Sequence, residues 1–187
     1  MSFSAGDSGT INIQLQPMAQ QYAVDLFNLT DANRDYLKQW LPWLNQVNSV
    51  EDTVRFIEVS LALKEQCGAP NYVILVDGVV AGVCGFHEIN PLNRISSIGY
   101  WLAERFTGRG IMTAAVARLI DHGFNQLNLH KIEIHCAEGN AKSIAIAERL
   151  RFQYEATLRD REWLYDRFVN HRVYSLLDFE YQTLEWR

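Results

Sequence analysis

The sequence predicts an α/β domain with a mixed sheet covered by helices, and three observations support this fold class. Apolar, β-branched runs such as residues 72–76 and 79–86 alternate along the chain with segments of helical periodicity. The expected order is a strand, helices, three mostly antiparallel strands, a helix, a strand, a helix and two strands. Residues 94–136 form a strand–turn–helix–strand unit, and such a unit makes its two strands parallel.

The N-terminal half is expected to contain one strand followed by helices. Residues 10–15 alternate polar and apolar side chains like a strand, and residues 17–29 are expected to form a helix with Pro17 in its first turn. The aromatic segment 31–46 is broken by Pro42, which indicates a short helix and an irregular stretch. Ser49 and Asp52 have the spacing of a capping box, so a helix starts there and ends near Gly68.

The C-terminal half is expected to supply most of the sheet. Asp77-Gly78 joins the strands 72–76 and 79–86 and is a strong signal for a two-residue hairpin. A strand over 94–103 leads through a glycine turn into a helix over 111–124, and residues 131–136 form the next strand. Asn140 is placed to cap a helix over 141–150. Two strands, 152–158 and 171–179, follow with a turn near 165–170 between them.

Length, composition and charge limit the class of protein. The 187 residues are 48% hydrophobic and 21% charged, so we expect one domain over residues 1–187. Residues 1–9 lack the features of a secretory signal and no apolar run reaches the ~20 residues of a membrane span, so we expect a flexible leader and a cytoplasmic protein. The net charge of −5 argues against nucleic-acid binding and favours a cationic partner.

The cysteines and histidines give no sign of a metal site. Cys67, Cys84 and Cys136 form no CxxC pair, so neither a disulfide framework nor a zinc site is expected. The five histidines are scattered and form no HExxH motif, which argues against metal catalysis.

Residues 104–116, ERFTGRGIMTAAV, carry the clearest functional signal. Gly108 and Gly110 let successive backbone N–H groups point into one concavity, and the start of a helix adds partial positive charge. A P-loop would have a lysine where Ile111 stands, and a dinucleotide fold would have a third glycine where Thr113 stands. The remaining interpretations are a metal-free cradle for a pyrophosphate and a tight turn without a ligand.

The turn and its flanks resemble the GNAT acetyltransferases. Arg105-Phe-Thr-Gly108-Arg-Gly110 fits that family's signature of Gln or Arg, two residues, Gly, one residue, and Gly or Ala, between a strand and a helix. The chain resembles the RimJ/RimL-type branch, the N-terminal acetyltransferases of ribosomal proteins, over residues 30–180. The segments that carry this resemblance are Asn33–Trp43, Ile98–Leu102 and Asn140–Ser143. Arg151 departs from the pattern, because many relatives have glycine there and a left-handed conformation would strain arginine.

The resemblance implies a GNAT fold and acetyl-CoA as the cosubstrate, without a metal. The sheet would be mostly antiparallel, with helices on both faces, and would splay open after residues 98–102. The pantetheine arm would pair with the exposed backbone of that strand, and the pyrophosphate would lie at the glycine turn, where the backbone of Arg109 matters more than its guanidinium. The residues expected to bind acetyl-CoA are Trp101, Leu102, Arg105, Gly108, Arg109, Gly110, Met112, Thr113 and Asn140.

Acetyl transfer to an amine requires a neutral amine, a stabilised oxyanion and a protonated leaving thiolate. A backbone N–H near Trp101 or Leu102 could stabilise the oxyanion, and the resemblance positions Ser143 as the proton donor. Glu162 matches the glutamate of the RimL-type pattern just before the final hairpin and is the first candidate base. Glu88, at the end of a strand, is the second. Ser143 could instead be a polar residue in the first turn of a helix, and Glu162 a surface carboxylate in the charged stretch that it forms with residues 159–161.

The expected acceptor is the N-terminus of a basic ribosomal protein. An α-amine has a pKa of ~8 against ~10.4 for lysine, so its neutral fraction near neutral pH is roughly 10²-fold larger and a single glutamate suffices. A small-molecule amine, such as a polyamine, aminoglycoside or amino-acid derivative, and a non-catalytic acyl-CoA-binding protein stay open. Trp40 and Trp43 could wall the acceptor cleft or pack on the core or a partner subunit, and the resemblance implies a possible homodimer.

Overall fold

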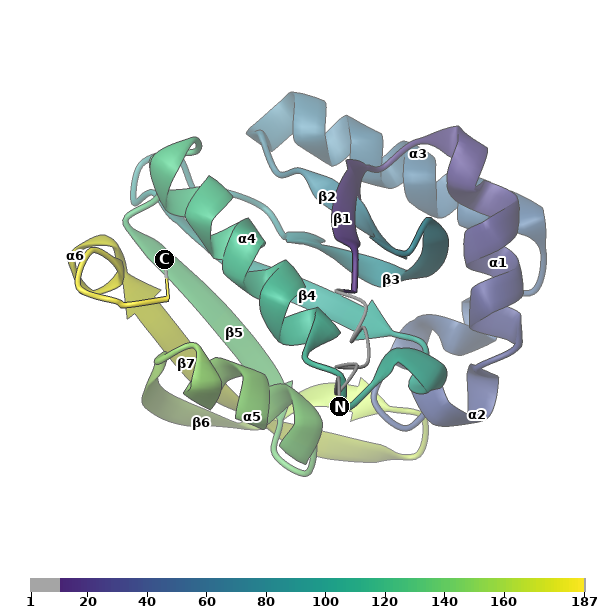
Figure 1. Ribbon diagram of the computed structural model, residues 1–187. Coiled ribbons are helices and arrows are strands. Elements are labelled where there is room, and N and C mark those ends of the chain that lie inside the picture. The colour runs from purple at the N-terminus through teal and green to yellow at the C-terminus, as the bar shows by residue number, and fades with distance from the viewer. Residues whose placement is uncertain (1–10, 187) are drawn as a thin grey trace, which may run out of the picture.

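The computed structural model in Figure 1 describes residues 11–186 and is built around one seven-stranded sheet. The strand order is β1-β2-β3-β4-β5-β7-β6. Neighbouring strands are antiparallel except β4 and β5, which are parallel as expected. The expected leader, residues 1–9, lies outside the described residues. The strands are β1 (Ile13–Pro17), β2 (Asn71–Val76), β3 (Val79–Phe86), β4 (Ile95–Leu102), β5 (Lys131–Ala137), β6 (Gln153–Leu164) and β7 (Arg167–Leu177).

Helices cover both faces of the sheet, as the resemblance implies. A side chain at Gly123 of α4 would meet Phe86 of β3 and Ile132 of β5, so α4 packs directly on this face (Figure 1). Val73 and Val83 point to the opposite face, where α1 and α3 bury them. The helices are α1 (Ala23–Asp31), α2 (Arg34–Leu37), α3 (Val50–Cys67), α4 (Ile111–Asn125), α5 (Ala141–Arg149) and α6 (Asp178–Tyr181), with 3₁₀ turns at Gln20–Tyr22, Pro42–Gln46 and Glu104–Phe106.

The predicted boundaries in the middle of the chain are confirmed. The Ser49 side chain accepts a hydrogen bond from the Asp52 N–H, and the Asp52 carboxylate accepts one from the Ser49 N–H, which completes the capping box of α3. Gly68 ends α3 with φ of 70°. Asp77 and Gly78 both have positive φ, 50° and 81°, as the tight hairpin between β2 and β3 requires.

Replacing Ser49 with alanine is expected to lower the free energy of unfolding by about 1 kcal/mol, because one N–H in the first turn of α3 loses its acceptor. Urea denaturation measures this change. Ser49→Asp, which keeps a capping oxygen, is the control and is expected to retain most of the stability. Equal midpoints for Ser49→Ala and the unmodified protein would contradict the role given to the cap.

The first strand and the first α-helix begin later in the chain than predicted. β1 covers Ile13–Pro17 rather than residues 10–15, and α1 begins only at Ala23. Pro17 therefore lies in a strand, paired with Tyr72 of β2, and not in the first turn of a helix. A proline is tolerated there because β1 is an edge strand, so its missing N–H leaves no neighbour unpaired.

The last two strands are longer than expected and form one hairpin. β6 runs from Gln153 to Leu164 and β7 from Arg167, so the connection is only Tyr165-Asp166. The pairing shifts register between Leu158 and Glu162, which marks a bulge. Glu162 therefore lies inside the hairpin, in β6, and not in a segment before it.

Among residues 11–186, no helix is both long enough and apolar enough to cross a membrane. In the same part of the chain, no group of three His, Cys, Asp or Glu side chains is arranged to hold a metal ion.

Candidate active site

β4 and β5 separate in the middle of the sheet. They pair only where Ile95–Ile98 meets Lys131–Ile134. Beyond that point β4 stays paired with β3 and β5 with β7, but β4 and β5 no longer pair with each other. The gap therefore opens at Gly99, within the segment 98–102 and not after it, which corrects the expected position of the splay.

The edge of β4 that faces this gap offers alternate peptide groups. The Ser97 carbonyl accepts from the His87 N–H and the Ala103 N–H donates to the Ala81 carbonyl, so the odd-numbered residues of β4 direct their backbone groups to β3. By alternation, the N–H and C=O groups of Tyr100 and Leu102 point into the gap. Of the two N–H donors expected for the oxyanion, Leu102 faces the gap and Trp101 faces β3.

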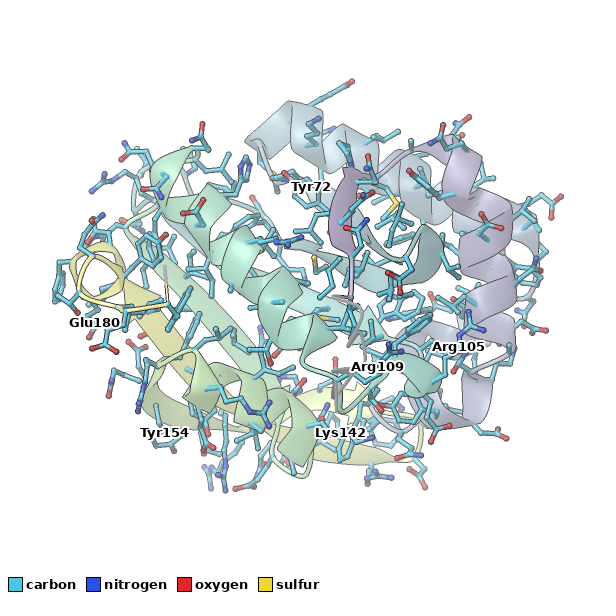
Figure 2. The ribbon with its side chains drawn as sticks, in the orientation of Figure 1. Tyr72, Arg105, Arg109, Lys142, Tyr154 and Glu180 are labelled. Atoms are coloured by element: carbon cyan, nitrogen blue, oxygen red, sulfur yellow. The ribbon has the colours of Figure 1, made fainter. Side chains whose placement is uncertain are left out.

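A cavity of about 960 Å³ adjoins the gap. This volume is at the upper end of the roughly 300–1,000 Å³ of small-molecule and cofactor sites. Seven of the nine residues expected to bind acetyl-CoA line it, namely Trp101, Leu102, Gly108, Gly110, Met112, Thr113 and Asn140. Arg105 and Arg109 do not line it. Figure 2 shows both near the N-terminal end of α4, and the Arg105 guanidinium lies over the Phe106 ring.

The start of α4 forms one wall of the cavity and has no cap of its own. Gly108 and Gly110 have φ of 73° and 74°, the left-handed conformation that favours glycine. Gly110 is the N-cap of α4 and offers no side-chain acceptor, and the first intrahelical bond comes from the N–H of Ala114. The N–H groups of residues 111–113 are therefore without helical acceptors beside the cavity, an arrangement that suits a phosphate. By contrast, side chains cap both α3 and α5.

The start of α5 brings Ser143 to the other side of the gap. The Asn140 side chain accepts a hydrogen bond from the Ser143 N–H at 3.2 Å, which confirms Asn140 as the N-cap. The Tyr100 hydroxyl of β4 donates to the Ser143 carbonyl at 3.3 Å, so the Tyr100 side chain reaches the first turn of α5. Sequence reasoning missed Tyr100, although its alternation with Leu102 in the strand 94–103 could have indicated it.

Burial keeps the groups around Ser143 protonated. It raises the pKa of the Cys136 thiol to about 12, against smaller opposing effects of the nearby Ser143 and Tyr100 hydroxyls. Burial also raises the pKa of the Tyr100 phenol, and the neighbouring Cys136 adds to this. Near neutral pH the Tyr100 phenol and the Cys136 thiol therefore carry no negative charge. The hydroxyl groups beside Ser143 can act as hydrogen-bond donors.

The two candidate tryptophans lie in different places. Trp40 lines the cavity and packs against Gly139, where an added Cβ would lie 3.0 Å from its ring. Trp43 contacts the Trp101 ring, with 6.3 Å between ring centroids. Since the Tyr100 side chain reaches α5, the Trp101 side chain points to the opposite face of the sheet. Trp40 thus belongs to the cavity, and Trp43 to the face on its far side.

Glu162 contacts a histidine on this far face. Its carboxylate Oε2 lies 3.3 Å from His171 Nε2 of β7. His171 pairs with Ala137, which alternates with the α5-facing Cys136, so both partners of this contact lie on the same face of the sheet as Trp101. Sequence reasoning missed His171, because only the register of the β6–β7 hairpin brings it to Glu162.

Two further histidines lie on the same face, where β4 and β5 diverge. His87 Nδ1 is 2.9 Å from the Ser97 hydroxyl, and His135 Nε2 is 2.9 Å from a Glu133 carboxylate oxygen. Desolvation lowers the pKa of His87, and the nearby His135 adds to this effect. Glu88 is exposed just after β3, and its carboxylate contacts none of the other candidate residues among those described.

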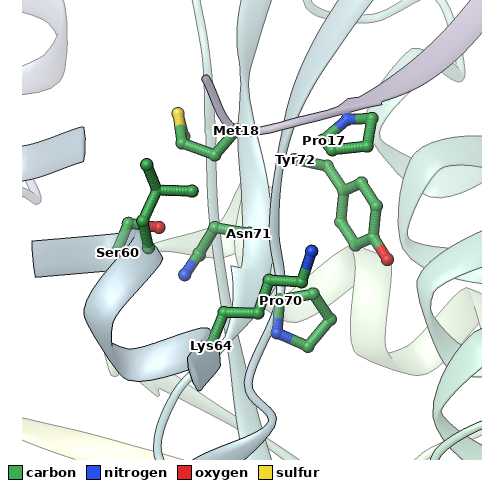
Figure 3. A pocket seen from close by; sticks show the side chains of 8 residues that line it. Pro17, Met18, Ser60, Lys64, Pro70, Asn71 and Tyr72 are labelled. Carbon is green, nitrogen blue, oxygen red and sulfur yellow. The ribbon is translucent and has the colours of Figure 1, made fainter. Parts of the chain in front are cut away.

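A second, much smaller cavity lies between α3 and the start of β2. Figure 3 shows Ser60 of α3 on one side and Pro17 and Tyr72 on the other, and Lys64 and Met18 also line the cavity. Its volume is about 40 Å³, which suits a water molecule and excludes a coenzyme.

Comparison with known proteins agrees with this geometry. The sequence profile of the family described as "Acetyltransferase (GNAT) domain" matches residues 12–153, more than half of the chain. The ribosomal-protein-serine acetyltransferase of Escherichia coli K12 is 31% identical over 164 residues, which cover 88% of this chain and 92% of that protein.

Solved structures show the same fold. A RimL ribosomal-protein α-N-acetyltransferase in complex with coenzyme A superimposes with a TM-score of 0.86 at 29% identity, covering 90% of this chain and 95% of that one. The microcin C7 self-immunity acetyltransferase MccE, in complex with acetyl-CoA and AMP, gives a TM-score of 0.84 at 32% identity, covering 88% and 92%. The chain therefore belongs to the GNAT family of acetyltransferases and is an acetyl-CoA-dependent N-acetyltransferase.

Proposed function

We propose that the protein transfers the acetyl group of acetyl-CoA to the N-terminal α-amine of a ribosomal protein. The observation that carries this proposal is the continuity of the site: the unpaired backbone of β4 leads directly to the uncapped start of α4 within one cavity. The similarity to the E. coli ribosomal-protein-serine acetyltransferase and to RimL supports the choice of acceptor.

The residues of the cavity suit the two chemical parts of the coenzyme. The peptide N–H and carbonyl of Tyr100 and the carbonyl of Leu102 offer a donor and two acceptors to the amides of the pantetheine arm. The free N–H groups of residues 111–113 suit the pyrophosphate, and Arg105 and Arg109 add positive charge near them. Acetyl-CoA supplies an acyl group activated as a thioester.

The catalytic roles follow from the two faces of the gap. The Leu102 N–H points into the gap and can donate to the acyl oxygen, and Ser143 can donate a proton to the leaving thiolate from the α5 side. Glu162 lies on the opposite face and can take the proton of the amine, with His171 holding its carboxylate. Glu88 is a weaker candidate because its carboxylate contacts no other candidate residue among those described.

The acceptor would approach from the face that carries Trp43, Trp101 and Glu162. This face is opposite the coenzyme cavity, so the two substrates would meet through the gap between β4 and β5. The net charge of −5 favours a positively charged acceptor. A cytoplasmic location, expected from the sequence features of residues 1–9 and the lack of a long apolar run, and a homodimer, implied by the resemblance, stay predictions.

A small-molecule amine is the second candidate acceptor, because MccE, a self-immunity enzyme bound to acetyl-CoA and AMP, is as similar to this chain as the ribosomal-protein acetyltransferases are. A non-catalytic acyl-CoA-binding role would require that no acceptor is acetylated at all.

Incubation with acetyl-CoA and a panel of ribosomal proteins and small amines distinguishes these acceptors. We expect mass spectrometry to find the acetyl group on the N-terminal residue of a ribosomal protein. Acetylation only of small amines would contradict the proposed acceptor. Release of no free CoA with any acceptor would support the binding role, provided that acetyl-CoA raises the melting temperature.

A further inference from the structure

His87 lies beside the gap between β4 and β5, on the face of the sheet opposite the coenzyme cavity. An added Cβ at Gly99 would lie 2.8 Å from His87 Nε2 and 3.0 Å from its Cε1, so the imidazole covers Gly99. Gly99 is the first residue of β4 beyond the segment Ile95–Ile98 that pairs with β5. The absence of a side chain at Gly99 therefore leaves room for the imidazole at the place where the two strands separate.

Three hydrogen bonds hold His87 in this position. Its backbone N–H donates to the Ser97 carbonyl at 2.9 Å, and its Nδ1 lies 2.9 Å from the Ser97 hydroxyl. The buried Ser96 hydroxyl donates to the His87 carbonyl at 3.0 Å. His87 Nε2 has no hydrogen-bond partner among residues 11–186, and the side chain is exposed to solvent. When Nδ1–H donates to Ser97, Nε2 keeps a free lone pair beside the gap that can accept a proton.

His135 lies on the other side of the gap. It follows Ile134, the last residue of β5 that pairs with β4, just as Gly99 follows Ile98 on β4. Desolvation lowers the pKa of His87, and the nearby His135 adds to this effect. His87 is therefore neutral near neutral pH and able to accept a proton.

Other titratable groups lie on or next to this face of the sheet, and most of them already have partners. They are Glu88 after β3, Lys131 and Glu133 of β5, Glu155 and Glu162 of β6, and His171 of β7. Glu133 binds both His135 and Lys131 at 2.9 Å. The side chains that α1 and α3 bury on this face are not titratable. Of all these groups, His135 acts most directly on His87.

Acetyl transfer removes two protons from the acceptor nitrogen. About nine-tenths of an α-amine with a pKa of ~8 is protonated at pH 7, so the amine must lose one proton before it can attack the thioester. The nitrogen loses a second proton as the C–N bond forms and the C–S bond breaks. Glu162 can take only one of these protons in each turnover.

We propose that His87 takes the first proton from the ammonium group of the acceptor, and that His135 keeps His87 in its proton-accepting form. His87 then releases this proton to solvent, to which its side chain is exposed. The second proton goes to Glu162 and replaces, through water, the proton that Ser143 gives to the thiolate. The reaction thus releases one proton per turnover. This inference rests on the proposed function and adds a second proton acceptor to it.

The dependence of kcat on pH tests this role, with saturating acetyl-CoA and the N-terminal peptide that the acceptor panel identifies. His87→Gln should lower kcat about 10- to 10²-fold at neutral pH, at the low end of the usual contribution because water can also take this proton. Gly99→Ala should have the same effect, since the added methyl group displaces the imidazole. His135→Gln should raise the pKa of His87, so the acid limb of the profile moves to higher pH while the rate in alkaline solution does not change.

His122 of α4 provides the matched control. Desolvation lowers its pKa too, but its ring packs edge to face on Tyr72, with 6.0 Å between centroids, away from the gap. His122→Gln should leave kcat and its pH profile unchanged. Calorimetry should find the same dissociation constant of acetyl-CoA for all of these variants.

The double variant of His87 and Gly99 separates the imidazole from the backbone. Gly99→Ala should cause no further loss once His87 is glutamine, because both changes remove the same group. Additive losses, or an unchanged profile in His87→Gln, would overturn the role of His87. Because His87 is exposed, its replacement tests the proposal even if the Gly99 variant does not fold. Failure of the unmodified protein to acetylate any N-terminal peptide would instead overturn the proposed function.

Discussion

Replacing Glu162 with glutamine is expected to lower kcat by about 10²- to 10⁴-fold, the usual contribution of a general base. Glutamine has the same shape and keeps the contact with His171, but it cannot take a proton from the acceptor amine. Steady-state kinetics with an N-terminal peptide measure kcat, and calorimetry measures the dissociation constant of acetyl-CoA, which should not change.

Glu155 offers the matched control for this change. It is also a glutamate of β6, but its carboxylate is bound by Lys131 and Ser175, away from the gap. Glu155→Gln should change kcat by less than about twofold relative to the unmodified protein, because it removes only a surface ion pair and such pairs contribute little energy. An unchanged kcat in the Glu162 variant would remove this residue as the base.

The role of His171 can be measured in the same assay as a double-mutant cycle. If His171 positions the Glu162 carboxylate, His171→Phe should lower kcat in the unmodified protein and have no further effect on Glu162→Gln. Additive losses in the double variant would show that His171 acts independently of Glu162.

Replacing Gly110 with aspartate is expected to weaken acetyl-CoA binding about 10- to 100-fold. A Cβ added at this position has no atom within 4 Å beyond the neighbouring residues, so a side chain has room to extend beside the free N–H groups of α4. A carboxylate there would occupy those donors and repel the pyrophosphate.

Gly110→Asn isolates the charge in this experiment. Asparagine and aspartate have similar shapes and tolerate the positive φ of this residue comparably well. The asparagine variant should therefore bind acetyl-CoA more tightly than the aspartate variant. This difference should account for most of the weakening that is expected for Gly110→Asp. Equal affinities for the two variants would mean that the start of α4 does not hold the phosphates.

Local signals predicted those parts of the fold in which short-range interactions decide the structure. The capping box at Ser49, the hairpin at Asp77-Gly78 and the cap at Asn140 each depend on residues a few positions apart. Arg151 also has the positive φ, 64°, that would be expected at a position where relatives have glycine.

The errors arose where pairing between strands decides the structure. Pro17 has the local features of a helix start, but pairing with Tyr72 places it at the end of an edge strand. Residues 159–162 lie beyond the expected strand 152–158, yet they continue β6, because an edge strand can carry charged side chains.

The coenzyme site was predictable from the sequence to a greater extent than the acceptor site. Gly108 and Gly110 form a contiguous motif whose conformation follows from the residues themselves. His171 meets Glu162 only through a bulged hairpin, and Tyr100 meets Ser143 only across the gap. Such contacts depend on register, which residue types alone do not specify.

Amide hydrogen exchange by NMR, with and without acetyl-CoA, tests the central claim that the open edge of β4 holds the coenzyme. The N–H groups of Tyr100 and Leu102 should become protected on binding, together with those of residues 111–113. Those of Gly99 and Trp101, which face β3, should already be protected and should change little. Unchanged exchange at Tyr100 and Leu102 under saturating acetyl-CoA would contradict the account.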